Sequence, residues 1–310
     1  MKKVSGRIAV AIALAACAAA APAADAYQPP PTIPWSSLLP GLPTRTNPQF
    51  SGATGCATPA PSCIDNEIAR MDALRQQLGC DHRAVFTTTY ELLTITFRDA
   101  LRDGTAGFQD PKWVIGEDGV FADLYFKWFD RYQRGQAVPA AWRVAFNTAR
   151  TGDANAIEDM LLGINAHVQR DMPYMLAAVG LHTPGGVSHK VDHDRFNELL
   201  NRAFQSVTDS IAQRFDPIEN LIAPSFNPVL GLVGNISGDQ LVQAWREGVW
   251  RNAERLLNAP TPAARRRVEA SIEANAALWA HAIAAIQFPP GYRVSRDAYC
   301  ALHVTQPLPH

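Results

Sequence analysis

Residues 155–179 read NAIEDMLLGINAHVQRDMPYMLAAV, the longest strongly apolar stretch after the N-terminal segment. Within it, Ile157, Leu161, Ile164 and Val168 recur every three or four residues, which places them on one face of a helix. A long helix with this much apolar surface must be covered by other elements. The stretch therefore predicts a helical core, and we work outward from it.

Apolar residues keep helical spacing on both sides of this stretch, and no window shows the alternation typical of a half-buried strand. We expect an all-α fold, a single bundle of roughly eight helices. Besides 155–179, the predicted helices cover residues 64–78, 84–102, 119–134, a short segment from Pro139 through Phe146, residues 188–215 with Ser188 as a cap, residues 238–256 and residues 261–286.

Two proline-containing stretches interrupt the pattern. Pro173 has no N–H group, so we expect the helix to kink or end just past Asp171. Residues 217–238 are rich in Pro, Gly and Asn and are long enough to form a functional loop or a lid.

The N-terminus predicts export. A basic segment and a short apolar run precede two Ala-x-Ala sites, which indicates a signal peptide over residues 1–26. Cys17 ends a Leu-Ala-Ala-Cys sequence similar to a lipobox, so a lipid anchor at Cys17 is the alternative to a released periplasmic or secreted protein. The Pro-rich residues 27–62 predict an irregular extension or linker before a helical domain of residues 63–310.

The other cysteines are Cys56, Cys63, Cys80 and Cys300, an even number that suits disulfides in an exported protein. Three pairings are open. Cys56 with Cys63 would close a small loop, and Cys80 with Cys300 would tie the C-terminal segment to the start of the domain. Free buried thiols are the alternative.

Composition excludes some partners. The formal net charge is -1, so no basic stripe is available for nucleic acid. The sequence lacks a Gly-x-Ser-x-Gly elbow, a phosphate loop and a dinucleotide fingerprint. We expect a small-molecule or lipid-like substrate, and contact with a membrane only through an N-terminal anchor; the oligomeric state stays open.

Four residues form the predicted site. His167 and Asp171 are four residues apart and are therefore neighbours on the helix surface. In the next helix, His193 falls on the inward face, and His189 joins it if the helix already begins there. Convergence of His167, Asp171, His193 and His189 would suit zinc or a similar divalent metal with one open position.

Three readings of these residues stay open. A metal would lower the pKa of a bound water molecule and supply a hydroxide for hydrolysis. Without a metal, Asp171 would orient His167 as a general base. In the third reading, the same residues only brace the core. His82, Glu91 and Asp123 are further candidate ligands.

Two segments resemble the bacterial family DUF5995, a domain of unknown function. The first is Asn165-Ala166-His167 with Asp171-Met172-Pro173, and the second is Asp192-His193 followed by Phe196-Asn197. The segment from Pro139-Ala140-Ala141-Trp142 through Phe146 also resembles this family. The resemblance covers residues 64 to 286 approximately and implies a helical domain, without an activity.

The His167 and Asp171 pair is also similar to the first metal-binding pair of the helical zinc-dependent phospholipase C and S1/P1-type nucleases. That family's second pair is not matched, because Asn197 follows His193 at the fourth position. The resulting hypothesis is a metal-dependent hydrolase of phosphoester or lipid-like substrates. The alternative is a non-enzymatic, envelope-associated or ligand-binding module in which the His/Asp network is structural.

Overall fold

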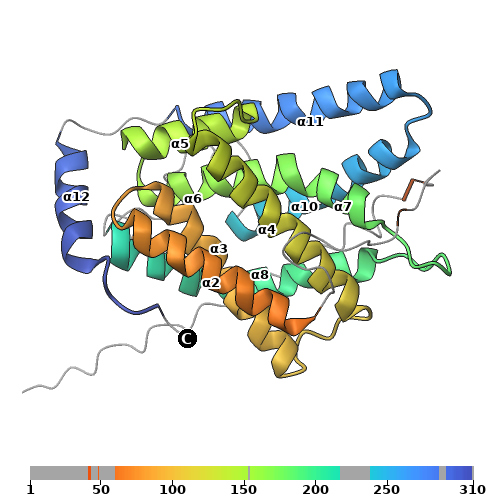
Figure 1. Ribbon diagram of the computed structural model, residues 1–310, viewed down its shortest axis with the longest axis horizontal. Coiled ribbons are helices and arrows are strands. Elements are labelled where there is room, and N and C mark those ends of the chain that lie inside the picture. Colours follow the sequence, from red (N-terminus) through yellow and green to blue (C-terminus); the bar gives the residue numbers. More distant parts are fainter. Residues whose placement is uncertain are drawn as a thin grey trace, which may run out of the picture.

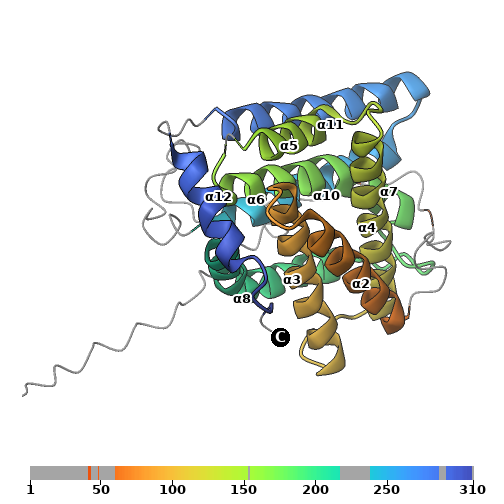
Figure 2. The same ribbon diagram turned by 60° about the vertical axis from the view of Figure 1, so that its left-hand side comes forward.

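Figures 1 and 2 show a computed structural model of the chain, which describes residues 41–42, 48, 60–152, 154–216, 238–285 and 291–308. The predicted signal peptide, most of the predicted linker and the predicted loop after residue 216 lie outside these residues. Cys17 and Cys56 lie outside them as well.

The described residues are helical apart from short connections and one isolated β-bridge between His182 and Ser188. This confirms the all-α prediction. The helices are α2 (Pro61–Leu78), α3 (Arg83–Arg102), α4 (Pro111–Gln133), α5 (Ala140–Thr151), α6 (Ala156–Ile164), η1 (Asn165–Asp171), α7 (Met172–Val179), α8 (Lys190–Phe215), α10 (Gly238–Asn258), α11 (Pro262–Ile283) and α12 (Tyr292–His303).

The predicted central helix is one continuous rod made of α6, η1 and α7. Helices α5 and α11 lie along one side of this rod and α3 and α8 along the other, while α4 crosses near its end (Figures 1 and 2). Helix α10 packs on α7 and η1, and α2 packs mainly on α3. The rod therefore touches most of the other helices, as its apolar sequence predicted.

The middle of the rod is a π-helix rather than an α-helix. In η1 the hydrogen-bond ladder widens, and the N–H of Met172 donates to the carbonyl of His167, five residues back. The widening comes directly before Pro173, which has no N–H to donate. The rod consequently stays helical past Asp171, where the sequence predicted a kink or an end.

Local sequence fixes the start of the rod and its distance from α3. The side chain of Asn155 accepts from the N–H of Glu158, and the Glu158 carboxylate accepts from the N–H of Asn155, which forms a capping box. Gly163 faces the ring of Phe86 so closely that a Cβ atom at position 163 would overlap it. Glycine thus lets α3 approach the rod.

Helix α12 is the one described helix that the periodicity did not predict. It packs on α8, and its Cys300 forms a disulfide with Cys80, across a sequence separation of 220 residues. This confirms one predicted pair. Cys63 is disulfide-bonded too. Nowhere in the described ranges is a helix both long and apolar enough to cross a membrane.

Candidate functional site

A cavity of about 110 Å³ lies between the rod and helices α3, α4, α8 and α10. Its wall is mostly apolar, and the apolar side chains come from every one of these elements. They are Phe86, Tyr90, Leu93, Phe121, Met160, Ile164, Val168, Met172, Met175, Phe196, Leu200, Phe204, Val207 and Val242. Of these, six side chains are partly exposed and mark the outer part of the wall: Leu93, Phe121, Ile164, Phe196, Leu200 and Phe204.

Asp171 is fully buried and is surrounded by donors. Its Oδ1 accepts from the indole N–H of Trp128 (3.0 Å) and from Arg170 (2.8 Å). Its Oδ2 accepts from the indole N–H of Trp142 (2.8 Å), and the Nδ1 of His167 lies 3.4 Å from the same oxygen. With both oxygens engaged in this way, Asp171 is held as a structural anion rather than as an open metal ligand.

The ring of His167 lines the cavity and is enclosed by aromatic side chains. It stacks on Phe121, with 3.4 Å between the ring centroids and 8° between the planes. The ring centroids of Tyr90 and Phe86 lie 4.8 and 5.7 Å from the centroid of the His167 ring. Burial lowers the pKa of His167, against the opposing effect of Asp171, so the ring is neutral at pH 7.

Carboxyl groups and an arginine complete the polar part of the wall. Burial raises the pKa of Glu117 to about 8 and that of Asp118 to about 7. Arg246 is buried as well; it donates to the side-chain oxygen of Asn197 (2.8 Å) and to the backbone carbonyl of His193 (2.6 Å). The wall therefore combines ionisable groups with an apolar surface, a combination common in binding and catalytic sites.

His193 and His189, the other two predicted ligands, have partners of their own. The Nε2 of His193 lies 3.1 Å from the backbone carbonyl of Arg246, and burial together with the Arg246 charge holds the pKa of His193 well below its usual range. The ring of His189 stacks on Trp113, with 4.4 Å between the centroids. His167 and Asp171 thus contact each other, whereas His193 contacts Arg246 and His189 contacts Trp113.

Across the part of the chain that the structure describes, no group of three or more His, Cys, Asp or Glu side chains is arranged to hold a metal ion. Two of the further candidate ligands form ion pairs. Glu91 binds Arg75 at 2.8 Å, and Asp123 binds Arg70 at 3.1 Å. Asp192, next to His193, accepts from the backbone N–H groups of residues 109 and 110 and so fixes the segment before α4.

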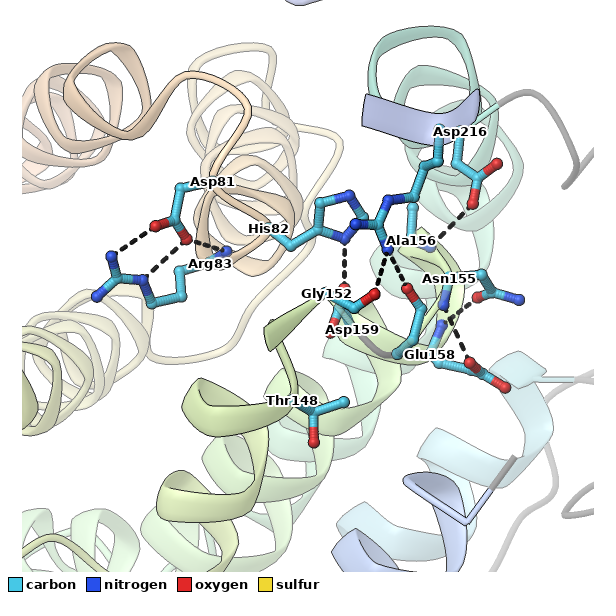
Figure 3. A network of polar contacts seen from close by, with 12 residues as sticks. Asp81, His82, Arg83, Thr148, Gly152, Asn155, Ala156, Glu158, Asp159 and Asp216 are labelled. Carbon is cyan, nitrogen blue, oxygen red and sulfur yellow. Dashed lines mark hydrogen bonds and ion pairs between the residues drawn. The ribbon is translucent and has the colours of Figure 1, made fainter. Parts of the chain in front are cut away.

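His82 belongs to a second buried His/Asp pair, on the far side of α6 from η1. Its Nδ1 lies 2.5 Å from the Oδ2 of Asp159, and the pair is surrounded by the polar contacts that start α6 (Figure 3). Asp216 nearby accepts from the N–H of Ala156 and from the hydroxyl of Tyr292 in α12. Neither His82 nor Asp159 lines the cavity. The pair joins the start of α3 to α6, and Asp216 joins the start of α6 to α12.

The sequence interpretation missed Tyr90, Glu117, Asp118 and Arg246 as site residues. Tyr90 follows Phe86 at helical spacing, a pattern that predicts only a core residue. Glu117 and Asp118 precede the predicted start at residue 119, but α4 already begins at Pro111. The signal was present: Asp110 before Pro111 is a typical helix start, and the Asp110 side chain accepts from the N–H of Trp113.

Glu117 gives a prediction about pH. The carboxyl group has a pKa of about 8 in the folded chain and 4.5 when unfolded, so the folded chain holds the proton more tightly. The stabilisation from that proton is complete below pH 4.5 and is lost as the pH rises toward and past 8. We expect wild type to lose about 1–2 kcal/mol more unfolding free energy than Glu117→Gln between pH 6.5 and 8.

Denaturant titrations at several pH values measure this difference. The charged groups that act on Glu117 are Arg246, Asp118 and Asp192, and all three are retained in the variant. Glu198→Gln, at an exposed position of α8, is the matched control and should follow the wild-type curve. Parallel curves for wild type and Glu117→Gln would contradict the assignment.

Comparison with known proteins gives one match. The model of a family described as a family of unknown function (DUF5995) matches residues 64–286, which contain the central rod and every cavity-lining residue named above. No curated protein and no solved structure matches the chain.

Proposed function

The chain belongs to the DUF5995 family, and from this premise we propose that it is a binding module that takes up a small apolar molecule in the cavity between the rod, α3, α4, α8 and α10. The observation that carries the proposal is the composition of the cavity wall. Apolar side chains come from every surrounding helix, and only a few polar groups lie among them. Small-molecule sites typically have this composition.

The size of the cavity supports a small ligand. Its volume of about 110 Å³ is of the same order as the ~150 Å³ of an engineered apolar cavity that binds benzene. Removing the apolar surface of such a ligand from water supplies the driving force, at about 25 cal/mol per Å². The partly exposed side chains of Leu200 and Phe204 allow a longer molecule to extend outward.

Benzene is the probe for the proposal. A ligand that binds only the folded state stabilises it, by about 1.4 kcal/mol at a tenfold excess over Kd. For a domain of this size, we expect the midpoint of thermal unfolding to rise by ~3–6 °C. Calorimetric titration gives the stoichiometry, which should be one.

Leu200→Trp tests the location of the binding site. Leu200 lines the cavity from α8, and a larger side chain there would occupy part of the ligand's space. We expect at least a tenfold loss of benzene affinity. Ser206→Trp is the control, because Ser206 is exposed on the same helix and does not line the cavity. A wild-type protein that binds no benzene, or equal affinities of the two variants, would refute the proposal.

The metal-dependent hydrolase remains a prediction from the sequence. The contact between His167 and Asp171 suits a general base, but the two other predicted ligands have separate partners. Metal analysis of the purified protein and of His167→Ala is the measurement that decides it. Export is likewise a proposal, and the disulfide between Cys80 and Cys300 is compatible with it.

A further inference from the structure

Three buried polar atoms on the cavity wall have no hydrogen-bond partner within the described residues. They are the hydroxyl of Tyr90, the Nε2 of His167 and the Oε2 of Glu117. Each of these side chains is more than nine-tenths buried. A buried polar group without a partner is destabilising, so a ligand that satisfies these atoms gains affinity. The unpartnered atoms therefore carry information about the polar end of the ligand.

The Nε2 of His167 is an acceptor. Its Nδ1 faces the Asp171 carboxylate, which can only accept, so the single proton of the neutral ring resides on Nδ1. Burial of the imidazole lowers its pKa and disfavours a second proton. A ligand group that satisfies Nε2 must bring a donor.

The hydroxyl of Tyr90 is available as a donor close by. The centroids of the Tyr90 and His167 rings are 4.8 Å apart, so the two residues are direct neighbours on the cavity wall. Tyr125 provides a contrast: its hydroxyl is paired with the Thr87 hydroxyl at 2.6 Å, and it does not line the cavity. Unpartnered buried atoms also occur away from the cavity, as at the Nε2 of His82, so the missing partner at Tyr90 bears on a ligand because Tyr90 lines the cavity.

We propose that the ligand is an apolar alcohol, whose hydroxyl donates to the Nε2 of His167 and accepts from the hydroxyl of Tyr90 while its hydrocarbon part fills the cavity. This inference rests on the proposed function. A hydroxyl group both donates and accepts, as these two atoms require. A ketone or an ester only accepts, which leaves Nε2 unpaired. A carboxylate also only accepts, and it must lose its hydration beside an apolar surface.

The test compares octan-2-ol with octan-2-one. The two molecules share a carbon skeleton, and only the alcohol can donate a hydrogen bond. We expect the wild-type protein to bind octan-2-ol about tenfold more tightly, which corresponds to one hydrogen bond at a buried site. Addition of octan-2-ol should also shift the ¹⁵N resonance of His167 Nε2, whereas octan-2-one should leave it in place.

Two variants separate the roles of the two residues. In His167→Phe an aromatic ring remains but the acceptor is gone, so the alcohol and the ketone should bind about equally well. In Tyr90→Phe both ligands should bind several-fold more weakly, because both lose the same donor. His82→Phe removes a buried histidine that does not line the cavity, and Tyr125→Phe removes the paired tyrosine hydroxyl. Both of these control variants should bind like wild type.

Each result decides between the two proposals. If both ligands bind equally well and Leu200→Trp weakens both, the apolar site stands and the alcohol assignment is wrong. A preference for the ketone, or an unchanged preference in His167→Phe, also overturns the assignment. If the wild-type protein binds neither ligand and no benzene, the alcohol assignment and the proposed function both fail. The ¹⁵N measurement on wild type keeps the test valid if His167→Phe does not fold.

Discussion

Replacing Asp171 with alanine is expected to lower the free energy of unfolding by about 3–5 kcal/mol, the cost typical of removing one partner from a buried charged network. The variant leaves the indole N–H groups of Trp128 and Trp142 without their acceptor. It also leaves Arg170 with Glu273 as its remaining carboxylate contact. No replacement acceptor is available, because Asp171 is fully buried.

Urea titration monitored by circular dichroism measures this loss. Asp65→Ala is the matched control, since Asp65 forms an ion pair with Arg102 in which both side chains are exposed. Surface pairs of this kind contribute about 0–1 kcal/mol. Asp171→Asn keeps one acceptor and should fall between the two variants. If Asp171→Ala costs no more than Asp65→Ala, Asp171 does not hold the rod in place.

The double variant Cys80→Ala/Cys300→Ala is expected to lose about 5 kcal/mol of stability. The disulfide closes a loop with a sequence separation of 220 residues, and the chain-entropy model gives about this value for such a loop. Helix α12 retains other contacts with the body of the bundle. Arg296 donates to the carbonyl of Ala154 (2.6 Å), and Arg214 donates to that of Val304 (2.6 Å). The folded structure should therefore persist.

Reducing agent provides the control for this experiment. If the covalent link causes the difference, wild type and the double variant should converge in stability once the disulfide is reduced. If the difference persists under reducing conditions, it comes from the lost packing of Cys300, which is fully buried. A loss below 1 kcal/mol in the absence of reductant would show that the loop contributes little.

Apolar periodicity predicted most of the fold, because helices that bury one face must repeat apolar residues at helical spacing. It failed at the start of α4 and at α12. The first turns of α4 contain Gly116, Glu117 and Asp118, which interrupt the apolar pattern. Glu117 and Asp118 line the cavity. The residues that hid the start of this helix are the same residues that make the cavity wall polar.

Helix α12 was missed for a related reason. Its buried side chains are Arg296 and Cys300, so it is held by hydrogen bonds and a disulfide rather than by an apolar face. The sequence marks Cys300 as a disulfide candidate but does not mark the helix around it. Attachment of this kind depends on partners distant in sequence, such as the carbonyl of Gly152, which a local pattern does not contain.

The candidate site was predicted in part. The spacing of His167 and Asp171 identified a real contact, because it depends only on neighbouring turns of one helix. His193 is buried, as predicted, but its ring binds the backbone of Arg246 in α10. Which partner an inward-facing histidine meets is decided by the packing of helices far apart in the chain. Whether the four predicted ligands converge on a metal therefore depends on this packing, which one sequence does not contain.

The π-helical segment η1 lets the rod absorb a change in the length of the chain. An i→i+5 ladder holds more residues in each turn than the 3.6 of an α-helix, so the seven residues of η1 turn the rod about as far as six α-helical residues would. We expect that deletion of one residue between 165 and 171 closes the ladder in the α pattern, while Met172 and Met175 keep facing the cavity. The side chains of η1 itself would change their positions, whereas the part of the wall that α7 provides would stay in place.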